Sequence, residues 1–256
     1  MPTSEEILEL VVDAGDVMLN NGAEINRVQQ TMEIMAHSFG AEGFHVYVLT
    51  NGLFATIDGE RQCTSAVRHV PSAGVHLGRV AAVNALSRGI ADGSISFAQA
   101  KQHVAQIRVK EYIKPLTQIL ACAVGTATFC FLFGGTWWDA LAALFTGVAL
   151  GAFQLIFRRY PAGKLITNLL CAMVVVAVSV ALVQLGLGQN LNYVIIGGIF
   201  PLVPGIVLTT SIRDFANSDY LSGTIRLIDA VLVAASIALG VGIVLKLVSV
   251  AWGVVL

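Results

Sequence analysis

Charged residues are scarce in this sequence. They make up 12% of its 256 residues, whereas hydrophobic residues make up 56%. Soluble domains carry about a quarter charged residues, so this composition favours a membrane protein. The formal net charge of −1 argues against a nucleic-acid partner, which would require a basic face or stripe.

Signatures of catalytic and metal chemistry are also missing. The four cysteines show no CxxC spacing, and the five histidines show no HxH or HExxH spacing. The chain contains no GxSxG sequence, P-loop or GxGxxG fingerprint. We therefore expect no enzyme activity, no metal and no cofactor. The N-terminus has no basic region followed by an apolar run, so we expect no signal peptide.

The charges that are present lie mostly in the first half of the chain. Of the 31 charged residues, 21 precede Pro115, as do all five histidines. Such a shift in composition indicates two domains in two solvents. The sequence predicts a soluble α+β domain at residues 1–114, followed by a transmembrane domain at residues 115–256.

The first domain shows the periodicities of a small α+β fold. Thr3 with Glu6, and Ser96 with Gln99, have the spacing of capping boxes at helix starts. Alternating apolar residues around Asn51-Gly52 and Asp58-Gly59 predict an antiparallel meander. The expected helices cover residues 4–19, 25–40, 73–87 and 97–112, and the expected strands cover residues 44–49, 53–57 and 63–70.

The second domain consists of long apolar runs joined by short loops. About 20 apolar residues at 1.5 Å each span a hydrocarbon core of ~30 Å. The expected spans are about 115–138, 140–157, 165–187, 193–212 and 227–248. The fold class is therefore a membrane all-α bundle of about five transmembrane helices preceded by a small soluble α+β domain.

The short loops differ in basic residues. Lys and Arg lie before the first span, after the second span, and around the loop between the fourth and fifth spans, while the two opposite loops have none. By the positive-inside rule, we expect the N-terminal domain in the cytoplasm and the C-terminus outside.

The fourth span is interrupted by Pro201, Pro204 and Gly205. Proline removes a backbone donor, and lipid does not satisfy the freed carbonyls. We interpret the interruption as a broken helix on a substrate path, with Thr209 and Thr210 supplying hydroxyls; a simple proline kink is the alternative.

Acidic residues near the spans are candidates for coupling or gating. Asp229 lies about one turn into the fifth span, where a carboxylate suits proton transfer; an interfacial pair with Arg226 is the alternative. Asp214 and Asp219 are expected as solvated charges of a cytoplasmic loop. Asp139 follows two tryptophans and is expected as an interfacial cap or an outer gate.

Two further patterns are less specific. Gly147 and Gly151 have the GxxxG spacing of closely packed membrane helices. Glu24 and Arg27 open the second helix, where they form either a polar site or a solvated first turn.

Four segments resemble signatures of the threonine/serine exporter family. They are residues 22–28 (Gly-Ala-Glu-Ile-Asn-Arg-Val), residues 83–88 (Val-Asn-Ala-Leu-Ser-Arg), residues 133–135 (Phe-Gly-Gly) with Asp139 and Gly147, and residues 201–205 (Pro-Leu-Val-Pro-Gly) with Asp219, Ser222, Gly223 and Arg226. The resemblance covers nearly the whole chain. It is strongest to the longer subunit of the family's split form, which carries the soluble domain.

The resemblance implies a subunit of a secondary exporter in a bacterial-type inner membrane. It implies threonine, serine or a dicarboxylate such as succinate as substrate, driven by the proton motive force. The implied partner is a short all-membrane subunit; a homo-oligomer is the alternative. A membrane-anchored enzyme and a non-transporting sensor or scaffold remain the rival functions.

Overall fold

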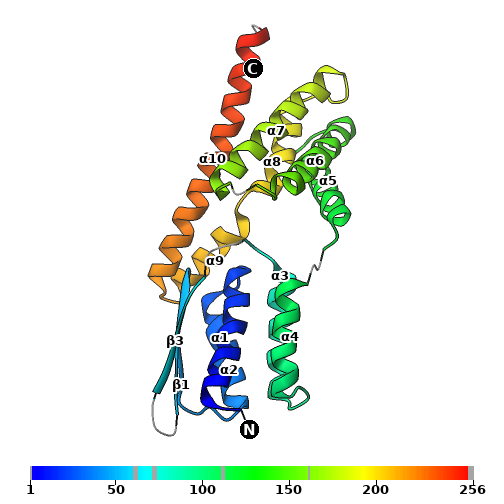
Figure 1. Cartoon of the computed structure of the whole chain (residues 1–256). Helices are drawn as coiled ribbons and strands as arrows, with labels where there is room; N and C mark the ends of the chain where they lie inside the picture. Colours follow the sequence, from blue (N-terminus) through cyan, green and yellow to red (C-terminus); the bar gives the residue numbers. More distant parts are fainter. Residues whose placement is uncertain (1, 60–62, 71–73, 111–112, 161, 253–256) are drawn as a thin grey trace. The chain divides into compact units, whose positions relative to one another are not determined.

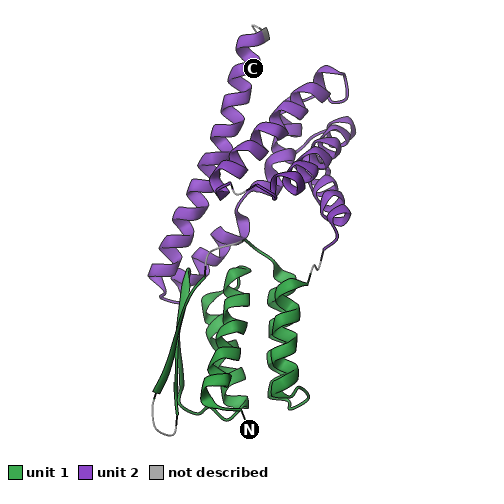
Figure 2. Ribbon diagram, in the orientation of Figure 1, with its two compact units in different colours: residues 1–112 green, residues 113–256 purple. Residues whose placement is uncertain are grey.

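The computed structural model describes residues 2–59, 63–70, 74–110, 113–160 and 162–252. It divides into two compact units, Met1–Tyr112 and Ile113–Leu256 (Figure 2). The division lies close to the change in charge density at Pro115. Each unit has its own core.

The first unit contains four helices and three strands in the described part of the chain. They are α1 (Ser4–Asn20), α2 (Ile25–Ser38), β1 (Phe44–Leu49), β2 (Gly52–Asp58), β3 (Cys63–His69), α3 (Leu77–Ala91) and α4 (Phe97–Val109) (Figure 1). The predicted meander is confirmed, since the sheet has the order β1-β2-β3 and both pairs are antiparallel. Helix α3 begins four residues later than predicted, and residues 111–112 of the expected last helix lie outside the described residues.

Local capping fixes where the helices of this unit begin. Both predicted capping boxes are confirmed: Thr3 N donates to Glu6 Oε2 at 2.9 Å, and Ser96 N donates to Gln99 Oε1 at 2.9 Å. Helix α1 ends before Gly22, whose φ of +82° is a conformation that glycine adopts without strain. These contacts depend on neighbours in sequence, which is why the sequence predicted them.

Helices α1 and α2 pack on the sheet (Figure 1). The core between them includes the fully buried Val11, Met18, Met32, Leu53 and Ile57. Burial of each such side chain contributes about 1.5–3 kcal/mol. This core makes the first unit a compact body of its own.

Asp16 on α1 lies at the edge of that core, with a side chain 17% exposed. Burial raises the pKa of its carboxyl above the ordinary value of 3.8, against the opposing charge of Arg108. The folded state therefore holds this proton more tightly than the unfolded state does. Ionisation of Asp16 costs stability at neutral pH, and the cost disappears as pH falls toward 3.8.

We expect Asp16→Asn to remove this pH dependence. The difference in thermal midpoint between variant and parent should grow as pH rises from about 3.8 through the raised pKa, and then stay constant. Circular dichroism melts at a series of pH values measure it. Parallel midpoint curves for the two proteins would contradict the assignment.

The second unit is helical throughout its described residues. Its elements are α5 (Pro115–Leu132), α6 (Trp137–Phe157), α7 (Lys164–Gln184), α8 (Leu191–Ile199), the 3-10 turn η1 (Phe200–Leu202), α9 (Gly205–Ala216) and α10 (Tyr220–Trp252). Among the described residues, α5, α6, α7 and α10 are each long and apolar enough to cross a membrane. The pair α8 and α9 makes up to a fifth span, with a bend of 56° at the break.

Several predicted span limits are wrong. The first span ends at Leu132, because the chain turns at Gly134 (φ +105°) and a new helix begins at Trp137. The fourth runs from Leu191 to Ala216 as two helices, with the predicted interruption between them. The fifth begins at Tyr220 and runs for 33 residues, because Asp219 caps it through the Ser222 N–H at 3.1 Å.

Helices α5 and α6 pack closely through the predicted glycines. A Cβ added at Gly147 would lie 2.7 Å from Ala123 Cα and 2.2 Å from Thr126 Oγ1, and one added at Gly151 would lie 3.0 Å from Ile119 Cα. Because Cα atoms cannot move away by a change of side-chain rotamer, such contacts could be relieved only if the two helices moved apart. The glycine spacing thus serves close helix packing in this unit.

Gly147→Ala is expected to destabilise the second unit by about 1–3 kcal/mol, because α5 and α6 must move apart. Gly242→Ala on α10 is the matched control, since an added Cβ there has no atom of the described part of the chain within 4 Å. The control should be neutral or stabilising by up to about 1 kcal/mol through helix propensity. Thermal unfolding of both variants in one detergent measures the difference, and equal midpoints would contradict the packing argument.

Candidate functional site

The interruption in the fourth span is a break rather than a kink. Helix α8 gives way to the 3-10 turn η1, Val203 is extended, and α9 begins after Pro204. Val203 N donates to Phe200 O at 3.1 Å, and Gly205 N donates to Val203 O at 2.8 Å. Because Pro201 and Pro204 have no N–H, they cannot continue the helical ladder.

One side of the break is packed tightly against neighbouring helices. A Cβ added at Gly197 would lie 2.7 Å from Thr126 O on α5, and one at Gly198 would lie 2.7 Å from Val175 Cγ1 on α7. Leu202 is buried among residues of α6, α7 and α10. The break is therefore held in place from this side.

The other side of the break is open. Pro201, Val203 and Gly205 are exposed, and a Cβ added at Gly205 meets no atom of the described residues within 4 Å. Irregular backbone at membrane depth is tolerated where protein covers it or where it lines a wet cavity. Within a membrane, the irregular backbone on this open side of the break would need contact with another protein segment or with water.

The two threonines after the break are on α9. Thr209 Oγ1 donates to Gly205 O at 3.0 Å, and Thr210 Oγ1 donates to Ile206 O at 2.8 Å. Their protons are thus used within the helix, and the hydroxyl oxygens remain as acceptors. Thr209 is exposed and Thr210 is buried.

A buried polar cluster joins the end of α9 to the start of α10. Arg226 Nε lies 3.2 Å from Asp214 Oδ2, with side chains only 14% and 7% exposed. Ser211 Oγ donates to Gly223 O at 2.7 Å. Ser222 Oγ is buried and has no hydrogen-bond partner among the described residues.

The expectation that Asp214 lies in a solvated loop is wrong. Helix α9 continues to Ala216, which puts Asp214 in its last turn, where the α9–α10 packing buries it. Asp219 is half-buried and caps α10. These residues therefore belong to the junction of two packed helices.

Asp229 pairs with a residue of another helix, Lys164, whereas the expected alternative partner, Arg226, is on its own helix. Its Oδ2 lies 2.5 Å from Lys164 Nζ at the start of α7, and both side chains are partly exposed. The alternative of an Arg226–Asp229 pair is wrong, because Arg226 turns toward Asp214 on α9. The pair Lys164–Asp229 links α7 to α10.

Asp139 is fully buried and accepts four hydrogen bonds. Its Oδ2 accepts from Thr136 N at 2.9 Å and from Thr136 Oγ1 at 2.8 Å. Its Oδ1 accepts from Gln189 N at 2.7 Å and Asn190 N at 2.8 Å. The side chain thus caps α6, as one alternative expected, and also holds the loop between α7 and α8.

The chain matches the family described as "Putative threonine/serine exporter" over residues 9–248. It belongs to the threonine/serine exporter family. That family is described as one of exporters.

One known protein is similar to this chain over most of the chain's length. The chain is 24% identical over 246 residues to a "Probable threonine/serine exporter" of Mycobacterium tuberculosis. The match covers 95% of this chain and 46% of that protein, so the chain spans about half the length of its relative. No solved structure matches the chain.

The exporter-family match extends through both units, and the predicted polar residues are divided between them. Glu24 is the N-cap residue of α2, and Arg27 is exposed in the first turn of that helix. Both belong to the first unit, whereas the broken helix and the acidic residues belong to the second. Among the described residues, no group of three His, Cys, Asp or Glu could hold a metal ion.

Several polar residues that the structure buries or pairs were not among the site residues predicted from the sequence. Ser211 and Ser222 are buried in the α9–α10 junction, and Lys164 pairs with Asp229. Thr146 and Ser179 are also buried, with hydroxyl oxygens 3.4 Å apart between α6 and α7. A signal was available for the last two, because isolated hydroxyls in apolar runs seek partners on neighbouring helices.

Proposed function

We propose that this chain is a subunit of a secondary exporter that moves small amino acids such as threonine and serine out of the cytoplasm. The broken helix between α8 and α9 carries this proposal. It lies in the part of the chain that matches the exporter family. The relative's name supplies the class of substrate.

The two helix ends at the break suit an amino acid. The C-terminal carbonyls of α8 form the negative end of a helix dipole, and the first N–H groups of α9 form a positive end. A zwitterion carries one charge of each sign, so its ammonium and carboxylate groups can face different ends. In transporters with discontinuous helices, half-helix N-termini face anionic groups of the substrate, and half-helix C-termini coordinate cations.

A second membrane subunit would complete the path. The exposed side of the break, at Pro201, Val203 and Gly205, needs a cover within the membrane, and the chain spans 46% of the length of its relative. We propose a short all-membrane subunit of the same family as the cover, with a second copy of this chain as the alternative. A five-span unit paired with an inverted counterpart would place the substrate between them.

Proton coupling is proposed to involve Asp229. Its ion pair with Lys164 would be released when the carboxylate takes up a proton. Basic residues in the loops favour a cytoplasmic first unit and an outside C-terminus in an inner membrane. The buried Asp214–Arg226 pair and Asp139 would then hold the helices around the path.

Export from proteoliposomes tests the proposal. Vesicles are loaded with labelled threonine, serine or succinate, a pH gradient is imposed, and efflux is followed with this chain alone and with its candidate partner. We expect threonine or serine efflux with both chains, and little succinate efflux. The absence of efflux of any solute from a folded complex would favour the sensor or scaffold function instead.

The break is tested by Pro201→Ala combined with Pro204→Ala, which restores two backbone donors and favours a continuous helix. We expect efflux to fall while the amount of folded protein is retained. Pro115→Ala is the matched control, because that proline occupies the first turn of α5, where no donor is needed. Unchanged efflux in the double variant would show that the break is structural only.

A further inference from the structure

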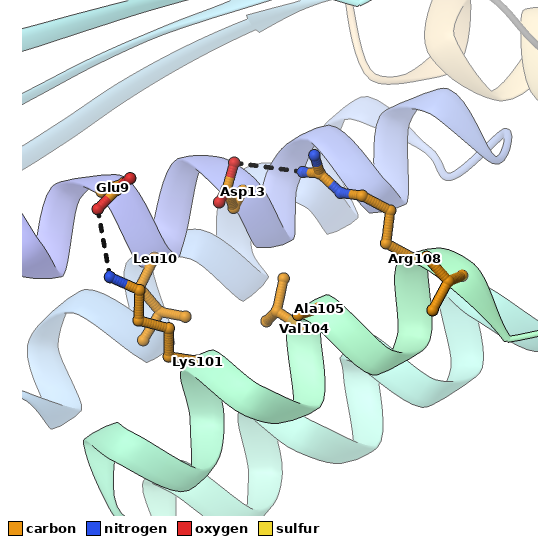
Figure 3. A pocket seen from close by; sticks show the side chains of 8 residues that line it. Glu9, Leu10, Asp13, Lys101, Val104, Ala105 and Arg108 are labelled. Carbon is orange, nitrogen blue, oxygen red and sulfur yellow. Dashed lines mark hydrogen bonds and ion pairs between the residues drawn. The ribbon is translucent and has the colours of Figure 1, made fainter.

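A cavity of about 320 Å³ lies between α1 and α4 in the first unit (Figure 3). Its two walls carry opposite charges. Glu9 and Asp13 come from α1, and Lys101 and Arg108 come from α4. Leu10 and Val104 form an apolar surface between them, as the close-up shows.

The charges across this cavity are paired loosely enough to exchange partners. Lys101 Nζ lies 3.5 Å from Glu9 Oε2, with side chains 61% and 58% exposed. Arg108 Nη2 lies 3.2 Å from Asp13 Oδ1, with side chains 47% and 33% exposed. Exposed pairs of this kind contribute about 0–1 kcal/mol, so a ligand can replace them at little cost.

The charge of the surrounding cluster is balanced. Arg108 also lies 3.0 Å from Asp16 Oδ2, and Asp13 also lies 3.3 Å from Arg68 Nη2. With Glu9 and Lys101, the cluster holds three carboxylates and three cations. A dicarboxylate that pairs with two of these cations would leave their carboxylates with excess negative charge, whereas a zwitterion leaves the balance of charge unchanged.

We propose that this cavity, which lies within the first unit, is a binding site for a small zwitterionic amino acid. The ligand's carboxylate pairs with Lys101 or Arg108, its ammonium group pairs with Glu9 or Asp13, and its side chain lies on Leu10 and Val104. The site would report the concentration of an amino acid to the first unit. The choice of threonine as the probe rests on the proposed function.

The size of the cavity fits this class of ligand. Its volume equals that of roughly ten water molecules in the liquid, which is enough for a small amino acid with some retained water. It is at the lower end of the range for small-molecule sites, so larger cofactors are not expected. Glu9 and Asp13 are one helical turn apart, about 6 Å along α1, so a ligand's ammonium group can reach either carboxylate.

Hydrogen–deuterium exchange on the full chain in nanodiscs tests the site. L-threonine is the probe, and succinate is the comparison. At a threonine concentration of about ten times Kd, amides that exchange by opening the cavity should slow by about tenfold, by mass action. We expect this protection in peptides from α1 and α4, and none with succinate.

Two variants separate cavity binding from other effects. Ala105→Trp fills the cavity from an exposed position of α4, and His103→Trp adds the same bulk at another exposed position of that helix outside the cavity. We expect Ala105→Trp to abolish the protection and His103→Trp to retain it. Absence of protection in the parent, or protection that survives Ala105→Trp, overturns the proposal.

Efflux measured in proteoliposomes, reconstituted from the same purified chain together with its candidate partner, keeps this proposal distinct from the proposed function. Efflux of threonine without protection of α1 and α4 overturns the cavity site and leaves the exporter standing. Protection without efflux supports the cavity site and counts against the exporter.

Discussion

Asp139→Asn is expected to lower the free energy of unfolding of the second unit by about 3–5 kcal/mol, because hydrogen bonds to a charged group contribute about 1.5–3 kcal/mol each. The carboxylate accepts two hydrogen bonds on each oxygen, from Thr136, Gln189 and Asn190. An asparagine keeps one oxygen and presents an NH2 group in place of the other. That NH2 group would face backbone N–H donors in a site that excludes water.

The effect of Asp139→Asn is measured as the shift in thermal midpoint of the purified chain in nanodiscs. Asp219→Asn is the matched control, because Asp219 caps α10 through one hydrogen bond to Ser222 N, and asparagine is as good an N-cap as aspartate. The control should melt within a few degrees of the parent. Equal midpoints for the two variants would mean that Asp139 does not hold the loop between α7 and α8.

Arg226→Met is expected to destabilise the second unit by about 3–5 kcal/mol, the usual effect of removing one partner of a buried ion pair. Methionine keeps much of the apolar length of arginine but removes the guanidinium group, whose Nε lies 3.2 Å from Asp214 Oδ2. Asp214→Asn combined with Arg226→Met removes the charge as well. The double variant should therefore recover a large part of the lost stability.

A double-mutant cycle on Asp214 and Arg226 measures this coupling directly. The same cycle on Lys164 and Asp229 is the comparison, since those side chains are 49% and 40% exposed and should couple by about 1 kcal/mol or less. A coupling at Asp214–Arg226 no larger than at Lys164–Asp229 would contradict the role of the buried pair in fixing α9 on α10.

The features that the sequence predicted correctly depend on residues that are close together in the chain. The Thr3–Glu6 capping box and the meander around Asn51 are local patterns, and both formed as expected. The break at Pro201 and Pro204 was predictable because proline lacks a donor wherever it occurs. The 56° bend that accompanies it follows from packing and could not be read from the prolines.

The features that the sequence did not predict depend on contacts between distant segments. Arg226 has Asp229 three residues away, yet it pairs with Asp214, because the α9–α10 junction brings Asp214 closer. Lys164 and Asp229 are 65 residues apart, and Asp139 is 50 residues from Gln189. Helical periodicity describes one helix at a time, so it carries no information about which helix will face another.

The length of α10 has a consequence for the lipid environment. Its 33 residues reach about 50 Å at 1.5 Å per residue, well beyond a hydrocarbon core of ~30 Å. The segment of α10 that follows Asp229 has a length close to the thickness of that core. The segment that precedes Asp229 packs against α9. Lipids with longer acyl chains would draw this leading part inward or change the tilt of α10, at a cost of fractions of a kcal/mol per Å. Through hydrophobic mismatch, the thickness of the bilayer would then act on α9, and so on the angle at which the helix is broken.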